Sequence, residues 1–187
     1  LNFIDLFSGA GGLSCGLEMA GLKCLLGVDF DKVATDTFKK NHKNAEIYAG
    51  DISSLTEEKI RELTKNEKVH LIVGGPPCQG LSTVGEGIPD DPRNFLFLQF
   101  VRIVKTVNPE FVIIENVTGM LGKKNENVLR GILSEFGRMG YRVNFNVLST
   151  HHYGIPQRRR RTIFIANRLG YRNIFPETTN GTGKSVI

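Results

Sequence analysis

Apolar runs alternate with amphipathic segments along most of the chain. Short apolar runs bounded by Gly, Asp or Pro are typical of buried strands, whereas apolar residues at helical spacing indicate a helix. The expected strands are residues 2–7, 23–28, 45–49, 69–73 and 111–114, and the expected helices are residues 12–20, 32–42, 56–66, 93–107 and 125–139. Strands this apolar need cover on both faces, so the pattern predicts an α/β fold with a mostly parallel sheet flanked by helices.

The pattern changes near the end of the sequence. Residues 141–150 and 161–167 are strand-like and are joined by a loop too short for a parallel crossover, which predicts an antiparallel hairpin. The final stretch, FPETTNGTGKSVI, is polar and glycine-rich. We therefore expect one domain over residues 1–170, and over residues 171–187 a linker or the start of a further domain.

Composition narrows the classes of protein. With 187 residues and 40% hydrophobic content, the chain suits one domain with a substantial core. The 24 basic against 19 acidic residues leave a net charge of +5, which favours an anionic partner without requiring one. The cysteines form neither a disulfide framework nor a zinc site, and no apolar run would span a membrane. These features indicate an intracellular protein, cytoplasmic if prokaryotic, with no metal and no membrane partner.

A glycine-rich turn, DLFSGAGGLSCG, follows the first predicted strand. Gly9, Gly11 and Gly12 allow the backbone to turn tightly and to approach a ligand that faces the start of the next helix. The stretch is not a dinucleotide-binding GxGxxG, because Ser14 stands where the third glycine would be. The turn therefore suits a carboxylate or a phosphate, and alone it is a weak signal.

Two aspartates follow the next two predicted strands. Asp29 is placed to accept hydrogen bonds from a ribose diol, and Asp51 to accept from an adenine amino group, because ligands of open parallel sheets bind beyond the carboxyl ends of the strands. The alternative is that both side chains only cap helices. Turn and aspartates together favour a nucleoside cofactor with a small charged tail.

The stretch GGPPCQGLS places Cys78 directly after the fourth strand, behind two prolines that stiffen the backbone. Cys15 and Cys24 lie within a helix and a strand, where they are expected to be inert packing residues. Glu115 ends the fifth apolar run, where desolvation is expected to raise its pKa and let it hold a proton. A nucleophile and a proton donor in one cleft suit attack on a weak aromatic electrophile.

Five stretches together resemble the cytosine-C5 DNA methyltransferases, namely DLFSGAGGLSCGLEMAG, GGPPCQGLS, DPRNFLF, IIENV and GIPQRRRRTIFIA. The resemblance implies a Rossmann-like class I methyltransferase fold, S-adenosyl-L-methionine as cofactor, duplex DNA as substrate and a restriction-modification setting. It implies catalytic roles for Cys78, Glu115, Arg159 and Arg161, and substrate contacts from Ser82, Asn116 and Gln157. The implied cofactor residues are Phe7, Gly9, Gly11, Gly12, Leu13, Asp29, Phe30, Asp51, Ile52, Pro77 and Leu96.

The implied chemistry accounts for these residue types. The Cys78 thiolate adds to C6 of a flipped cytosine, which makes C5 nucleophilic enough to take a methyl group, while Glu115 hydrogen-bonds or protonates N3. Elimination then releases 5-methylcytosine. The loop of residues 83–92 resembles a flap that closes over the base.

The run from Arg158 to Arg161 has two interpretations. Alternate side chains of a strand share a face, so Arg159 and Arg161 are expected in the site and Arg158 and Arg160 outside it. The alternative is a solvated basic patch. The neighbouring His151 and His152 are expected to be ordinary loop residues.

The family normally continues into a target-recognition domain and a last motif, neither of which is visible in this sequence. A missing segment or a second chain is expected to supply target recognition. The alternative functions are a transfer-RNA cytosine-C5 methyltransferase and a non-catalytic half of a split enzyme that binds cofactor or DNA. A nicotinamide-dependent oxidoreductase lacks support, because it needs the third glycine and gives Cys78 no task.

Overall fold

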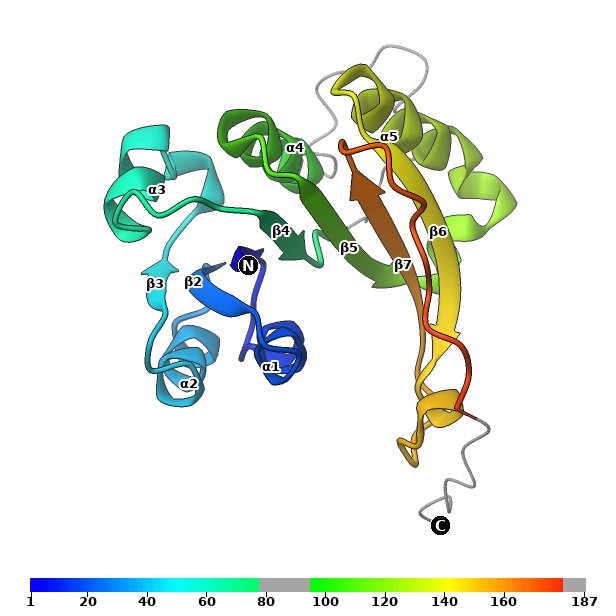
Figure 1. Cartoon of the computed structure of the whole chain (residues 1–187), viewed down its shortest axis with the longest axis horizontal. Coiled ribbons are helices and arrows are strands. Elements are labelled where there is room, and N and C mark those ends of the chain that lie inside the picture. Colours follow the sequence, from blue (N-terminus) through cyan, green and yellow to red (C-terminus); the bar gives the residue numbers. More distant parts are fainter. Residues whose placement is uncertain (78–94, 180–187) are drawn as a thin grey trace.

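The computed structural model describes residues 1–77 and 95–179. These residues form a seven-stranded sheet of order β3-β2-β1-β4-β5-β7-β6 (Figure 1). The strands are β1 (Asn2–Leu6), β2 (Lys23–Asp29), β3 (Glu46–Ala49), β4 (Leu71–Gly74), β5 (Phe111–Val117), β6 (Arg142–Ser149) and β7 (Arg160–Asn167). The α-helices are α1 (Gly12–Met19), α2 (Lys32–Asn41), α3 (Glu57–Leu63), α4 (Phe95–Val107) and α5 (Glu126–Arg138). Short 3-10 turns are η1 (Ile52–Ser54), η3 (Thr118–Leu121), η4 (Lys123–Asn125) and η5 (Thr150–Tyr153).

Helices cover both faces of the sheet (Figure 1). In β1, Ile4 and Leu6 pack in the core beneath α3, α4 and α5, whereas Phe3 packs in a second core with Phe38 of α2. Successive strand residues point to opposite faces, so both faces of a central strand are buried. This arrangement confirms the predicted α/β class with a mostly parallel sheet.

The last two strands form the predicted antiparallel hairpin, and β7 also pairs antiparallel with β5. Because β5 is paired along its whole length, it runs on to Val117, three residues beyond the predicted end at residue 114. The first strand ends at Leu6 rather than residue 7, because Phe7 has a left-handed φ of 61°. The predicted helix of residues 56–66 ends at Leu63, and Lys65 and Asn66 after it have positive φ.

Residues 168–179 lie along the hairpin rather than leading away from it (Figure 1). The Asn173 side-chain amide donates to the backbone oxygens of Arg142 and Ile165, both at 2.9 Å. Further along, the Tyr153 hydroxyl donates to Pro176 O at 3.2 Å. The segment from residue 171, predicted to be a linker or the start of a further domain, is thus hydrogen-bonded to the hairpin strands at Asn173 and to η5 at Pro176 and Thr179, and residues 180–187 lie outside the described range.

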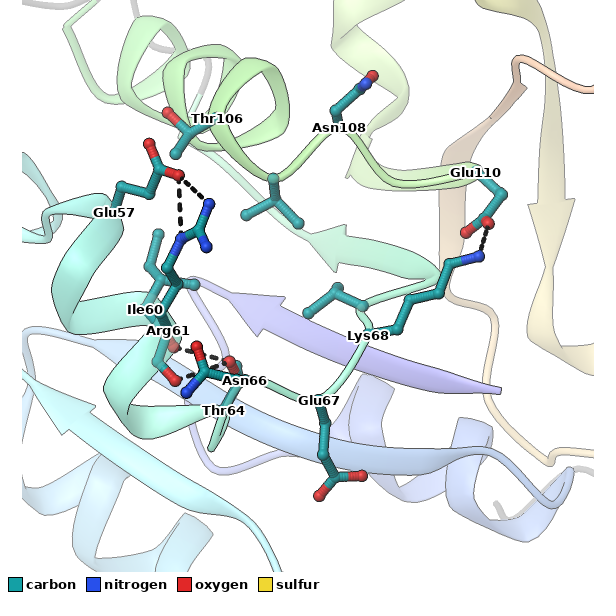
Figure 2. A pocket seen from close by; sticks show the side chains of 12 residues that line it. Glu57, Ile60, Arg61, Thr64, Asn66, Glu67, Lys68, Thr106, Asn108 and Glu110 are labelled. Atoms are coloured by element: carbon teal, nitrogen blue, oxygen red, sulfur yellow. Dashed lines mark hydrogen bonds and ion pairs between the residues drawn. The ribbon is translucent and has the colours of Figure 1, made fainter.

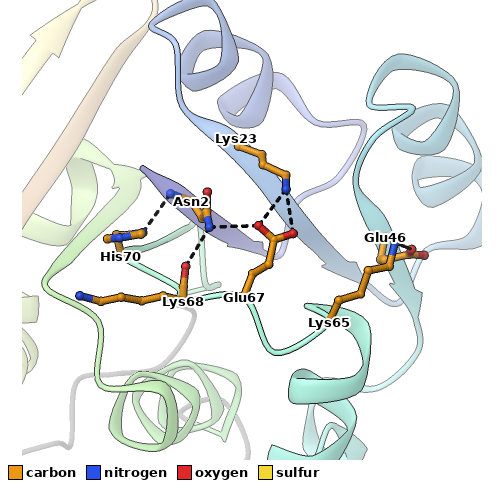
Figure 3. Close-up of polar contacts among 7 residues, drawn as sticks. All are labelled: Asn2, Lys23, Glu46, Lys65, Glu67, Lys68 and His70. Carbon is orange, nitrogen blue, oxygen red and sulfur yellow. Dashed lines mark hydrogen bonds and ion pairs between the residues drawn. The ribbon is translucent and has the colours of Figure 1, made fainter.

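Polar side chains link neighbouring strands at the amino edge of the sheet (Figure 3). The Asn2 backbone N–H donates to His70 Nδ1 at 3.1 Å, which links the starts of β1 and β4. Lys23 at the start of β2 pairs with Glu67 at 2.7 Å. These contacts hold neighbouring strand ends together on the side of the sheet opposite the predicted ligand site.

A pocket of about 260 Å³ opens at this amino edge, between α3, the end of α4 and the segment before β4 (Figure 2). Its cationic side chains already have partners, since Arg61 pairs with Glu57 at 2.6 Å and Lys68 with Glu110 at 2.5 Å. The pocket lies away from the strand ends that carry the predicted site residues, and both of its cationic side chains are paired with carboxylates of the lining. No helix within the described residues is both long and apolar enough to span a membrane.

A buried carboxyl group joins β1 to α1. Asp5 is 1% exposed, and its Oδ2 accepts from Ser14 Oγ at 2.6 Å. Burial raises the pKa of Asp5 to about 7, although hydrogen bonds from Ser14 oppose the shift. Gly11, which precedes α1, has no side chain to cap the helix, so this carboxyl group from the sheet acts at the helix start instead.

We predict that Asp5→Asn flattens the pH dependence of stability. In the unmodified chain the folded state keeps a proton on Asp5 that the unfolded chain releases near pH 4. Stability is therefore lost as the pH rises from about 4 to about 7, by up to a few kcal/mol. Urea unfolding from pH 4 to pH 8 measures this slope. The exposed Asp36→Asn is the control, and an equal slope in Asp5→Asn and the unmodified chain would contradict the assignment.

Candidate active site

The glycine-rich turn lies at the carboxyl edge of the sheet and is held by Asp29. The Gly9 N–H donates to Asp29 Oδ2 at 2.8 Å, and the other carboxylate oxygen accepts from Asp31 N at 3.0 Å. Asp31, not Asp29, caps α2. The helix-capping alternative therefore does not describe Asp29, which joins the end of β2 to the turn after β1.

Gly11 is the tightest position of the turn. Its φ is +92°, and a Cβ placed there would lie 2.1 Å from His42 Nε2. Gly9 and Gly12, in contrast, have no heavy atom among the described residues within 4 Å of such a Cβ. Gly11 is thus required by packing beneath the turn, whereas the side above Gly9 and Gly12 is open to a ligand.

The residues predicted to contact adenine follow β2 and β3. Asp51 is exposed, caps η1 by accepting from Ser53 N at 2.8 Å, and has a pKa lowered by that backbone hydrogen bond. Ile52 is buried in the core, whereas Phe30 after β2 is 80% exposed. The capping alternative thus describes Asp51, although its carboxylate remains at the surface, where a ligand can reach it.

Arg102 of α4 is a functional candidate that the sequence did not indicate. Its guanidinium donates to Ile52 O at 2.8 Å and to Leu55 O at 3.0 Å, so it fixes the turn that carries Asp51. The contact joins residues about 50 positions apart in the chain. No local pattern could have revealed it.

Glu115 pairs with both predicted arginines. Its Oε1 lies 2.8 Å from Arg161 Nε and 3.3 Å from Arg159 Nη2, and its side chain is 29% exposed. In the β5–β7 register Glu115 lies opposite Ile163, so Arg161, two residues from Ile163, is a diagonal neighbour on the same face. The predicted pairing of Arg159 and Arg161 on one face agrees with these contacts. These contacts make the surroundings of Glu115 ionic. The desolvation predicted for this carboxyl group stays a prediction.

The end of β4 lies against the end of β5. The Asn116 side-chain amide donates to Pro76 O at 2.9 Å, and the residue is only 7% exposed. A Cβ at Gly75 would lie 3.4 Å from Glu115 Oε2, so the backbone leading to Cys78 passes directly by this oxygen. Asn116, predicted to contact substrate, therefore has its amide on the backbone of the cysteine-bearing stretch.

Other predicted residues lie at the rim or outside the described range. Pro77 is exposed and Leu96 half-buried, as are Phe7 and Leu13 beside the glycine-rich turn. Gln157 is exposed in the loop before β7, where its backbone oxygen accepts from Thr150 Oγ1. Cys78, Ser82 and the loop of residues 83–92 lie outside the described residues.

The remaining loop residues behave as local structure. His151 accepts or donates at Nδ1 with Ser149 Oγ at 2.8 Å, and its pKa is lowered by partial desolvation, then by His152 and Arg158. Arg158 and Arg160 are exposed. Among residues 1–77 and 95–179, no group of His, Cys, Asp or Glu side chains could hold a metal ion.

Comparison with known proteins identifies the class. The C-5 cytosine-specific DNA methylase family model matches residues 1–184, and the chain therefore belongs to this family. It is 38% identical to the type II methyltransferase M1.HphI of Haemophilus parahaemolyticus, covering 96% of this chain and 49% of that protein. It is 36% identical to the type II methyltransferase M.AquIA of Picosynechococcus, covering 96% and 77%.

Solved structures agree with this assignment. A putative DNA modification methyltransferase encoded within an Escherichia coli prophage matches with a TM-score of 0.77 and 34% identity, over 89% of this chain and 46% of that one. Spodoptera frugiperda DNMT2 matches with a TM-score of 0.72 and 26% identity, over 90% and 50%. The predicted family and methyltransferase fold are confirmed, and the chain spans about half the length of most of these proteins.

We predict that Gly11→Ala destabilises the chain by several kcal/mol. The new methyl group would overlap the His42 ring, and the alanine backbone would be held at an unfavourable φ. Gly9→Ala has a similar backbone conformation with open space and should lose only about 1–2 kcal/mol. Urea unfolding of both variants separates overlap from backbone strain. Equal losses would show that the His42 contact is not tight.

Proposed function

We propose that the chain carries the cofactor-binding and catalytic part of a DNA (cytosine-5-)-methyltransferase that acts within the cell in a restriction-modification setting. The family match supports the reaction class. The single observation that carries the proposal is the meeting of Glu115, Arg159 and Arg161 beside the backbone that leads to Cys78. One acid, two cations and a thiol, which Cys78 supplies in sequence just after this backbone, suit attack on a cytosine ring.

The carboxyl edge fits S-adenosyl-L-methionine as the cofactor. The open side of Gly9 and Gly12 leaves room for the methionine end, the carboxylate of Asp29 borders that space for the ribose, and exposed Phe30 and Asp51 are available to adenine. We infer that these residues hold the cofactor, which when bound supplies an electrophilic methyl group. Arg102 then acts indirectly by fixing the turn after β3.

In the proposed reaction, Cys78 adds through its thiolate to C6 of a cytosine flipped out of duplex DNA. Glu115 meets the N3 edge of the ring. Since Oε1 takes both ion pairs, Oε2, which faces Gly75, is the oxygen proposed to reach the base. Arg159 and Arg161 orient this carboxylate and counter charge that develops on the ring. Asn116 positions the stretch that precedes Cys78 through Pro76 O.

A second candidate is a cofactor- or DNA-binding half of a split enzyme, with target recognition on another segment or chain. One observation favours this candidate: the chain covers 77% of M.AquIA but only about half of M1.HphI. M.AquIA is therefore a type II methyltransferase chain that is shorter than M1.HphI.

We predict that the 187-residue chain binds S-adenosylhomocysteine weakly, does not bind NAD, and shows little methyl transfer alone. Asp29→Ala should weaken cofactor binding at least about tenfold, because the turn loses its Gly9 partner and the ribose loses its acceptor. Isothermal titration calorimetry measures both affinities, with exposed Asp36→Ala as control. Strong sequence-specific methylation by this chain alone would overturn the expectation of dependence on a further segment.

We predict that Cys78→Ser abolishes covalent trapping by 5-fluorocytosine in duplex DNA, because serine lacks the thiolate that adds to C6. The full product of the gene should be tested with DNA and with RNA, and the adducted residue identified by mass spectrometry. Cys15→Ser, which removes an exposed thiol of α1, should trap normally. An adduct on another residue, or trapping by RNA alone, would refute the proposed activity.

A further inference from the structure

The His42 side chain lies buried directly beneath the glycine-rich turn. The residue is 3% exposed and follows α2, and its ring lies tilted against the ring of Phe38 of that helix, with the ring centroids 4.3 Å apart. Its Nδ1 lies 2.6 Å from Glu18 Oε2 on α1, and its Nε2 lies 3.1 Å from Gly11 O. One imidazole thus bridges two helices and the turn.

The two partners of the ring fix its proton count. A backbone carbonyl only accepts hydrogen bonds, and so does an ionised carboxylate, whereas a neutral imidazole has a single N–H. A neutral His42 beside an ionised Glu18 would have one N–H for two acceptors. Satisfying both contacts therefore needs one further proton. The Glu18 side chain keeps 34% exposure, so water solvates its charge, and the extra proton is assigned to the ring. The 2.6 Å separation is typical of a strong charge-assisted hydrogen bond.

We propose that His42 is a positioning residue whose doubly protonated ring, paired with Glu18, holds the Gly11 carbonyl and thereby keeps the glycine-rich turn in its ligand-binding shape. The identity of that ligand as S-adenosyl-L-methionine rests on the proposed function. Gly11 O also accepts from Cys15 N at 2.8 Å, so the same carbonyl starts α1. Movement of this oxygen would disturb both the turn and the first turn of the helix.

The charged group in contact with the ring is an anion. Glu18 faces the ring from α1, and Asp29 lies at the end of β2 on the other side of the turn, whereas Asp5 of β1 is a buried carboxyl group that keeps its proton up to about pH 7. Glu46 of β3 is occupied by Lys65. Cys24 of β2 has a pKa raised to about 12 by burial, so it stays a neutral thiol. The imidazolium therefore has the Glu18 carboxylate as its contacting ion.

The two contacts determine which substitutions can preserve the turn. A ring with a single N–H must give up either Glu18 or Gly11. The amide of Glu18→Gln avoids this loss, because it donates to Nδ1 while a singly protonated ring still donates to Gly11 O. Glu18→Gln should therefore keep the turn formed, whereas His42→Gln cannot make both contacts.

Three measurements on the whole chain test this proposal. Nitrogen-15 NMR of the imidazole reports whether both ring nitrogens carry protons at pH 7. Hydrogen exchange of the Gly9 and Gly11 amides, which donate to Asp29 and Ser8, reports the order of the turn without any ligand. Calorimetry with S-adenosylhomocysteine reports the affinity of each variant. His70→Gln, at the opposite edge of the sheet, is the matched control.

We expect two protonated ring nitrogens in the unmodified chain and one in Glu18→Gln. In His42→Gln, but not in His70→Gln, the turn amides should exchange faster and cofactor binding should weaken about tenfold. Glu18→Gln should keep the turn order and the affinity of the unmodified chain. A singly protonated ring in the unmodified chain, or unchanged exchange of the turn in His42→Gln, would overturn the proposal. Absence of nucleoside binding with the expected NMR and exchange results would instead refute the proposed function and leave the positioning role standing.

Discussion

The antiparallel direction of β7 is the constraint on which the candidate site depends. A seventh strand running parallel to β5 would bring its carboxyl end to this edge, but β7 instead begins there. Arg159 and Arg161 therefore meet Glu115 at the end of β5, with Arg161 a diagonal neighbour in the register. The same edge carries the glycine-rich turn and Asp29, so the groups proposed for a cofactor and for a base lie at one edge although they come from both halves of the chain.

Three side chains hold backbone carbonyls close to proposed site residues. His42 lies beneath Gly11, Arg102 holds the carbonyl of Ile52, and Asn116 holds that of Pro76. In each case a side chain fixes a backbone carbonyl next to a proposed functional residue. Because carbonyl positions determine where neighbouring N–H groups and side chains point, this arrangement makes the loops at the edge more rigid than their sequences alone would.

The apolar pattern predicted every strand and α-helix of the described residues to within a few positions. Errors arose where tertiary pairing outweighed local sequence. The polar Glu115 and Asn116 ended the apolar pattern, yet pairing with β7 continues β5 through both. Among the described residues, the strand ends that carry the motifs lie at one edge, because topology brings the ends of parallel strands together, while the roles of the site residues stay predictions. Arg102 and His42 could not be predicted, since their partners are distant in sequence and are backbone atoms common to every residue type.

The segment after β7 has a practical consequence for dissecting the protein. Asn173 bonds to carbonyls of both hairpin strands, and Thr179 Oγ1 donates to His152 O at 3.1 Å. A gene fragment that stops at residue 170 would delete residues 171–179 and expose the hairpin groups that they cover. Extending the coding region past residue 179 retains these bonds, so that boundary suits recombinant expression better than the edge of the last strand.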